Sequence, residues 1–205
     1  MQNTPFKQHP LRRHLASLLV ASAAAVLLPV AAWAQGTPVA ETPKVRLSTS
    51  MGDIVLELYP DKSPKTVENF LQYVRDKHYD GTVFHRVINN FMIQGGGFNA
   101  DFQQKATRAA IPLEASNGLK NDRGTIAMAR TQNPNSATAQ FFINVVDNAA
   151  LNAPNPDGHG YAVFGKVTAG MDVVDKIKLV PVGNQGMHQN VPKTPLTILK
   201  ATLEK

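Results

Sequence analysis

The sequence predicts a mainly β protein, either a closed β-barrel or a β-sandwich, with two short helices. Many apolar segments of strand length are separated by Gly, Asn, Pro or Asp, which is typical of such folds. Two other segments carry apolar residues at helical spacing. No similarity repeats with a period of 20–50 residues, so the strands are not expected to form a repeat architecture.

The first predicted elements are a β-hairpin and a helix. Residues 45–47 and 54–58 alternate apolar and polar side chains on either side of a turn at Met51-Gly52-Asp53. Ser63 is then placed to cap a helix, with Pro64 at the first helical position. Apolar residues at i, i+3, i+4 and i+7 give this helix one buried face: Val67, Phe70, Leu71 and Val74.

The remaining predicted strands are short. They cover residues 83–88, 91–94, 125–130, 141–146, 162–167 and 196–203. A second short helix is predicted after Gly170, because Met171, Val174 and Ile177 are spaced along one face. Two long polar loops are predicted at 98–116 and 152–160. The run Gly95-Gly96-Gly97 predicts a sharp backbone bend after Gln94.

Residues 1–34 have the three parts of a secretory signal peptide. A basic start without acidic residues precedes an apolar stretch from Leu15 to about Val30, and Ala32-Trp33-Ala34 forms a small-x-small cleavage pattern. A permanent membrane anchor is the alternative, but the stretch is marginal for a span of about 20 residues. We therefore expect a cleaved leader at 1–34, a flexible mature N-terminus at 35–43 and one domain at 44–205.

The basic character of the chain comes partly from this leader. The net charge is +6 at pH 7, and it falls to +3 without residues 1–34, which hold three Lys/Arg and no Asp/Glu. No run of five or six like charges remains, so no nucleic-acid partner is expected. No stable membrane association is expected after cleavage either. The remaining 171 residues suffice for one domain that buries roughly 70% of its unfolded surface.

Several classes of catalytic chemistry find no support in the sequence. The chain has no cysteine, which removes thiol catalysis, thiolate zinc sites and CxxC redox chemistry. The histidines after residue 34 show no metal-ligand spacing such as HExxH. There is no G-x-S-x-G motif, and the glycine run at 95–97 lacks the Lys-Ser/Thr of a phosphate loop. We expect neither a metal nor a cofactor.

Arg86 stands out because of its neighbours. If residues 83–88 form a strand, Phe84, Arg86 and Ile88 share one face and His85 lies on the other. An arginine between large apolar residues is costly unless its head group is paired or functional. A side chain that reaches water at the sheet rim is an equally good explanation. His85 is better explained as a hydrogen-bonded structural residue, since no partner for a general base is evident.

Five segments together resemble the cyclophilins, a family of peptidyl-prolyl cis/trans isomerases. Residues 84–96, FHRVINNFMIQGG, resemble the signature F-H-R-[IV]-I…F-M-x-Q-G-G. Further similar segments are SPKTVENF at 63–70, GTIAMA at 124–129, SATAQFFI at 136–143 and YAVFGKV at 161–167. The motifs occur in the family order over about residues 44–203, which is far more specific than any single motif.

This resemblance implies a fold, a reaction and substrates. The fold would be an eight-stranded closed antiparallel β-barrel capped by two α-helices. The reaction would be rotation about Xaa-Pro peptide bonds, against a barrier of roughly 18–20 kcal/mol set by amide resonance. No bond is broken, so neither a nucleophile nor a cofactor is needed. The substrates would be proline-containing peptides.

The resemblance also implies the site residues. Arg86 matches the catalytic arginine, which would donate to the prolyl nitrogen when the twisted amide restores its lone pair. The implied substrate-binding residues are Phe91, Met92, Phe142 and Leu151 around the proline ring, Gln94 and Gln140 against the peptide backbone, and Ala129 and Tyr161 beside them. Without the resemblance, the apolar residues of this set would be interpreted as ordinary core.

Three positions depart from the commonest family pattern and look like a bacterial exported branch. Ala150 stands where a rim tryptophan is usual, Tyr161 where a histidine is usual and Arg130 where an asparagine is usual. Cyclophilins typically bind cyclosporin, and the rim tryptophan both packs against the drug and donates to it. The resemblance therefore implies that proline binding is kept while the contacts at the rim change.

We expect a monomeric periplasmic isomerase that acts on unfolded exported proteins. One alternative is a binding-only chaperone with the same fold, which Arg86 argues against, because proline binding alone needs no donor over the amide nitrogen. The other is a structural or adhesion domain that an uncleaved leader holds at the membrane. The N-terminus of the mature protein would distinguish this second alternative.

Overall fold

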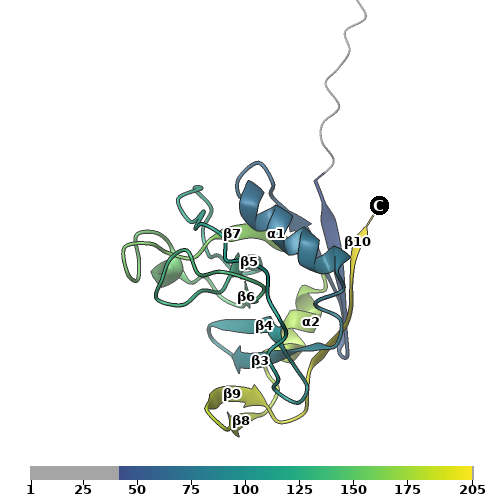
Figure 1. Cartoon of the computed structure of the whole chain (residues 1–205). Helices are drawn as coiled ribbons and strands as arrows, with labels where there is room; N and C mark the ends of the chain where they lie inside the picture. Colours follow the sequence, from purple (N-terminus) through teal and green to yellow (C-terminus); the bar gives the residue numbers. More distant parts are fainter. Residues whose placement is uncertain (1–41, 205) are drawn as a thin grey trace, which may run out of the picture. The chain divides into compact units, whose positions relative to one another are not determined.

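The computed structural model describes residues 42–204. Eight strands close into one barrel in the order β1-β10-β3-β4-β6-β5-β7-β2, and every pair of neighbours is antiparallel (Figure 1). The predicted eight-stranded antiparallel barrel with two helices is therefore confirmed. The predicted leader and the segment 35–41 lie outside the described residues and are not tested.

The predicted elements agree with the observed ones to within a few residues, apart from the end of β4 and one hairpin. The barrel strands are β1 (Lys44–Thr49), β2 (Gly52–Leu58), β3 (Thr82–Ile88), β4 (Met92–Asn99), β5 (Thr125–Met128), β6 (Phe141–Asn144), β7 (Val163–Ala169) and β10 (Thr197–Glu204). The helices are α1 (Pro64–Arg75), the 3-10 turn η1 (Ala149–Leu151) and α2 (Met171–Ile177). The sequence did not predict the separate hairpin of β8 (Val182–Gln185) and β9 (His188–Pro192).

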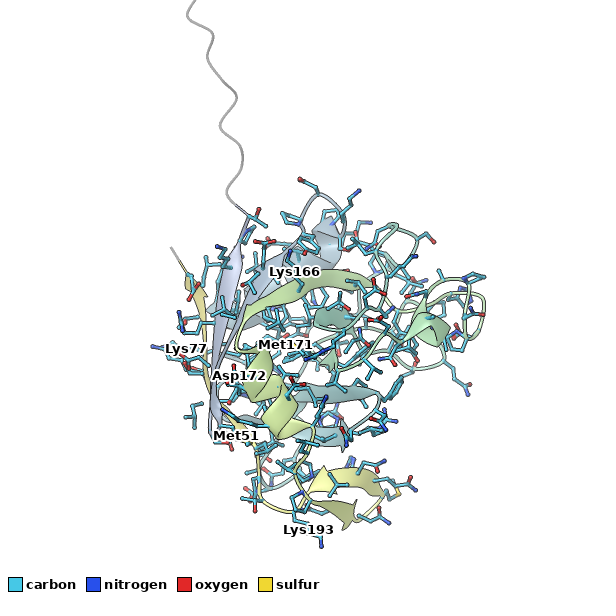
Figure 2. The ribbon with its side chains drawn as sticks, turned by 180° about the vertical axis from the view of Figure 1, so that it is seen from behind. Met51, Lys77, Lys166, Met171, Asp172 and Lys193 are labelled. Atoms are coloured by element: carbon cyan, nitrogen blue, oxygen red, sulfur yellow. The ribbon has the colours of Figure 1, made fainter. Side chains whose placement is uncertain are left out.

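Side chains from both helices complete the barrel core. The ring of Phe70 in α1 packs edge-on against Phe141 in β6, with centroids 5.8 Å apart, and at 5.2 Å from Phe164 in β7. From α2, Val174 and Ile177 are fully buried in the same cluster. Figure 2 shows α2 from the opposite side, with Met171 and Asp172 labelled at its start. The interior is thus filled by side chains, and any site must lie on the outer wall.

The start of α1 is stabilised differently from the prediction. Ser63 occupies the N-cap position, but its hydroxyl does not cap the helix. It donates instead to the carbonyl of Val163 at 2.8 Å. The carboxylate of Glu114, in the loop between β4 and β5, accepts hydrogen bonds from the backbone N–H groups of Lys65 and Thr66 at 3.1 and 2.8 Å. A distant residue therefore satisfies helix donors that a local cap would otherwise satisfy.

The side chains of β3 do not alternate between two faces as predicted, because the pairing of β3 with β4 contains register shifts. Phe84 pairs with Gly95 while Arg86 pairs with Gln94, so the ladder is irregular between them. As a result Phe84 points into the barrel core, and Arg86 lies on the outer wall. The prediction that Phe84 shares a face with Arg86 and Ile88 was wrong, because it assumed an unbroken two-residue period.

The sequence predicted that the strand ends in a sharp bend at the glycine run, and this prediction was wrong. β4 continues through it to Asn99. Gly96 has φ = 84°, and a Cβ there would lie 2.8 Å from the Tyr79 ring and 3.0 Å from the Phe141 ring. A Cβ on Gly97 would overlap the side chain of Gln140. These glycines let the irregular strand pass close to its neighbours, as in a β-bulge, rather than forming a sharp bend.

Among the helices within residues 42–204, none is both long and apolar enough to span a bilayer.

Candidate active site

A small cavity of about 180 Å³ opens on the outer wall of the barrel, beside β3, β4, β5, β6 and η1. Eight of the nine sequence-predicted site residues line it, together with Arg130. These residues are Arg86, Phe91, Met92, Gln94, Ala129, Phe142, Leu151 and Tyr161. The ninth, Gln140, does not line the cavity but contacts Gln94. The structure thus brings the whole predicted set together.

An apolar cluster separate from the barrel core forms the floor of this cavity. Met92, Phe142 and Leu151 are all at least nine-tenths buried in it. Strand alternation explains the separation, since Ile93, the neighbour of Met92, points into the barrel core. The Tyr161 ring meets Phe142 edge-on at 5.7 Å and adds to one wall. The cavity can therefore hold a compact apolar ring.

Arg86 borders this apolar cavity and is oriented by a chain of amides. Its Nη1 donates to Gln94 Oε1 at 3.3 Å, and Gln94 Nε2 donates to Gln140 Oε1 at 2.9 Å. Among residues 42–204, Arg86 forms no ion pair. Most of the five N–H donors of the guanidinium therefore remain for a bound molecule.

His85 is buried next to Arg86, with only 5% of its surface exposed. Burial, with smaller contributions from the nearby His188 and Arg86, lowers the pKa of His85 to about 4. The ring packs edge-on against Phe98 at 4.8 Å, and Nδ1 has no hydrogen-bond partner among the described residues. The predicted structural role agrees with this burial, but the hydrogen bond that was predicted with it is not found at Nδ1. The predicted opposite face does not, since His85 and Arg86 line one groove.

Arg130 is a cavity residue that the sequence analysis left out of the site. Its side chain is only 1% exposed. Nε and Nη2 both donate to the carbonyl of Gly160, at 3.0 and 2.8 Å, and Nη2 also donates to Asp157 Oδ1 at 2.8 Å. The guanidinium carbon lies 4.4 Å from the centroid of the Tyr161 ring, within cation–π range. Arg130 thus ties the loop 152–160 and Tyr161 to the cavity wall.

The sequence held one sign that Arg130 supports the cavity wall, namely that Arg130 and Tyr161 both differ from the residues usual in the family. Both positions differ from the common family residues, and the structure places them in contact. The hydrogen bond from Arg130 also lowers the pKa of the Asp157 carboxyl. Sequence alone could not show the contact, because it depends on how the loop 152–160 folds back.

We expect Arg130→Ala to weaken peptide binding and to lower stability. The variant leaves the buried Gly160 carbonyl without its donor, which costs about 1–3 kcal/mol. For a domain of this size, Tm falls by roughly 2–4 °C per kcal/mol. Because the resemblance to the cyclophilins implies that Tyr161 contacts the substrate, KM for a proline peptide should rise more than kcat falls when Tyr161 loses its support. Thermal unfolding and steady-state isomerase kinetics measure both effects.

Asp157→Asn provides the control for Arg130→Ala, because it removes only the exposed ion-pair partner. It should change Tm and KM much less. Equal effects from the two variants would show that the ion pair, rather than the contacts with Gly160 and Tyr161, holds this wall.

Comparisons with known proteins agree with this geometry. The family model for cyclophilin type peptidyl-prolyl cis-trans isomerases matches residues 44–203. The chain is 63% identical over 161 residues to the isomerase cyp18 of Streptomyces antibioticus, covering 78% of this chain and 97% of that protein. It is 58% identical over 163 residues to isomerase B of Escherichia coli, covering 78% and 99%.

Solved structures show the same likeness. A Cryptosporidium parvum cyclophilin type isomerase, determined in the presence of the dipeptide Ala-Pro, is 28% identical with a TM-score of 0.65, covering 79% of this chain and 99% of that one. The family match spans the whole barrel and the cavity beside Arg86. The chain therefore belongs to the cyclophilin type peptidyl-prolyl cis-trans isomerases.

Proposed function

We propose that Arg86 is the catalytic residue of this isomerase and that the adjoining cavity binds the proline ring. The observation that carries this proposal is a guanidinium that has no ion-pair partner within residues 42–204 and lies at the edge of a small apolar cavity. In a planar amide the prolyl nitrogen hardly accepts hydrogen bonds, but the twisted amide restores its lone pair. A donor held at this edge therefore stabilises the twisted state more than either planar form.

The remaining cavity residues would position the substrate. Met92, Phe142 and Leu151 give the proline ring an apolar floor. Gln94 and Gln140, which are hydrogen-bonded to each other, offer amide groups to the peptide backbone. Phe91, Ala129 and Tyr161 form the sides. The related structure determined with Ala-Pro supports proline-containing peptides as the ligands of this cavity.

The proposal is tested by measuring cis/trans exchange of a short Xaa-Pro peptide with the purified protein. Uncatalysed exchange takes about 10–100 s. Exchange that accelerates in proportion to protein concentration is expected. Peptide binding without acceleration would instead support the binding-only chaperone. Phe142→Ala, which empties part of the cavity floor, should weaken binding of the same peptide.

We further propose that the chain is exported and acts as a monomer in the periplasm, where it assists the folding of exported proteins. The support comes from the sequence: a basic start, a short apolar stretch and Ala32-Trp33-Ala34 before the barrel. Cell fractionation with mass spectrometry of the N-terminus tests this part. A periplasmic protein that begins at Gln35 is expected. A protein that retains Trp33 would contradict the cleavage site, and one held at the membrane would support the anchored alternative.

A further inference from the structure

A second groove, of about 380 Å³, lies directly beside the proline cavity. Its barrel side consists of His85, Arg86 and Gln94. Arg86 and Gln94 also line the proline cavity, so the two spaces meet at the guanidinium. The volume is within the usual range of ligand-binding clefts. A molecule that passes Arg86 on leaving the proline cavity therefore enters this groove.

The other side of the groove is the polar hairpin of β8 and β9, which projects from the barrel next to β3 (Figures 1 and 2). Aromatic packing holds this hairpin in place. The ring of His188 lies 5.1 Å from the Phe98 ring and 5.2 Å from the Phe102 ring, and 6.5 Å from His85. Val191 in β9 is buried as well. The groove thus has two fixed walls.

The groove is lined by one guanidinium, two imidazoles and three amide groups, all of which can donate hydrogen bonds, and by no carboxylate. Its hairpin side consists of Met187, His188, Gln189 and Asn190. Two amide side chains and an imidazole on this side line the same groove as the Arg86 guanidinium. Met187 at the turn is 98% exposed and offers an apolar surface at the rim. This lining suits an extended peptide whose side chain carries acceptor oxygens, and a carboxylate best of all.

We propose that this groove is a substrate subsite that binds the polypeptide flanking the isomerised proline and favours an acidic side chain there. The inference depends on the proposed placement of the proline ring in the neighbouring cavity. An extended chain advances about 3.3–3.6 Å per residue, so the acidic residue lies roughly one to three positions from the proline. The hairpin that the barrel topology does not require thereby gains a role in specificity.

The test compares matched peptides that carry Glu, Gln or Lys at each of the three positions on either side of one proline. On one side, kcat/KM for Glu should exceed that for Lys by about two- to fivefold, the range for partly exposed charge pairs, and salt should reduce the difference. Gln189→Glu adds a negative charge to the groove without a change of shape, and it should abolish or reverse the preference.

Asn184→Asp is the matched control. It makes the same amide-to-carboxylate change on β8 of the same hairpin, at an exposed position that does not line the groove. The Glu preference should survive in this variant, and turnover of a neutral peptide should equal that of the unmodified protein.

Three outcomes would overturn the subsite: equal kcat/KM for all peptides, a preference that survives Gln189→Glu, or an equal loss in Asn184→Asp. None of these outcomes would contradict the catalytic role proposed for Arg86, because that role is tested by turnover of the neutral peptide.

Discussion

Replacing Arg86 with alanine should lower kcat by about 10²–10³-fold, while KM for a proline peptide changes little. Losses of this size follow the removal of one preorganised donor that acts mainly in the transition state. Among residues 42–204 Arg86 makes a single long hydrogen bond, to Gln94 at 3.3 Å, so its loss should hardly affect folding. Exchange kinetics of one peptide, measured with a thermal unfolding curve, separate the effect on turnover from any effect on stability.

Arg86→Lys is the control for this prediction. Lysine keeps the positive charge but loses the planar fork that fixes the direction of the donors. It should restore only a small part of the turnover, if donor geometry rather than charge is decisive. Near-normal turnover in Arg86→Ala would contradict the proposed mechanism, and full rescue by lysine would show that charge alone is sufficient.

The isomerase should be poorly inhibited by cyclosporin, with an affinity at least about 100-fold weaker than that of relatives with a rim tryptophan. Ala150 occupies the corresponding position, in η1, and its side chain is exposed beside the cavity residue Leu151. Alanine provides neither the apolar area of an aromatic ring nor an indole donor, which is worth about 0.5–1.5 kcal/mol. A hundredfold change corresponds to about 2.8 kcal/mol.

Titration of cyclosporin into the isomerase assay measures this directly, and Ala150→Trp is the matched variant. The variant should tighten inhibition while turnover of short peptides stays the same, because Ala150 does not line the proline cavity. Complete inhibition of the unmodified protein at nanomolar drug would contradict the prediction. So would an Ala150→Trp variant that binds the drug no better.

Residue patterns alone predicted the barrel elements well where one face of an element is buried and the other is not. β1 alternates in this way, and α1 has a single apolar face. The site residues were harder to predict from residue patterns, because β6 is buried on both faces. Phe141 packs inside the barrel, and Phe142 lines the neighbouring cavity. In the sequence both residues look like core residues. Only the resemblance to a known family separated them.

The features that the sequence missed depend on tertiary contacts. Phe84 and Arg86 lie on different faces of β3 because the pairing with β4 is irregular between them. The sequence of β3 itself has no clear sign of this irregularity. The hairpin of β8 and β9 is mostly polar, so it lacks the alternation that marks a strand. Arg130 acts through a loop whose path no local pattern fixes.

The cap that Glu114 places on α1 has a consequence for how the domain folds. The two capped N–H groups lie 49 and 48 residues before Glu114 in the chain. A peptide with the sequence of α1 alone therefore lacks the acceptor that its first turn uses in the folded protein. Because closing a loop of this length costs entropy before the contact forms, the helix start and the β4–β5 loop should gain stability together. Protection of the Lys65 and Thr66 amides from hydrogen exchange would then report the docking of that loop rather than the local stability of the helix.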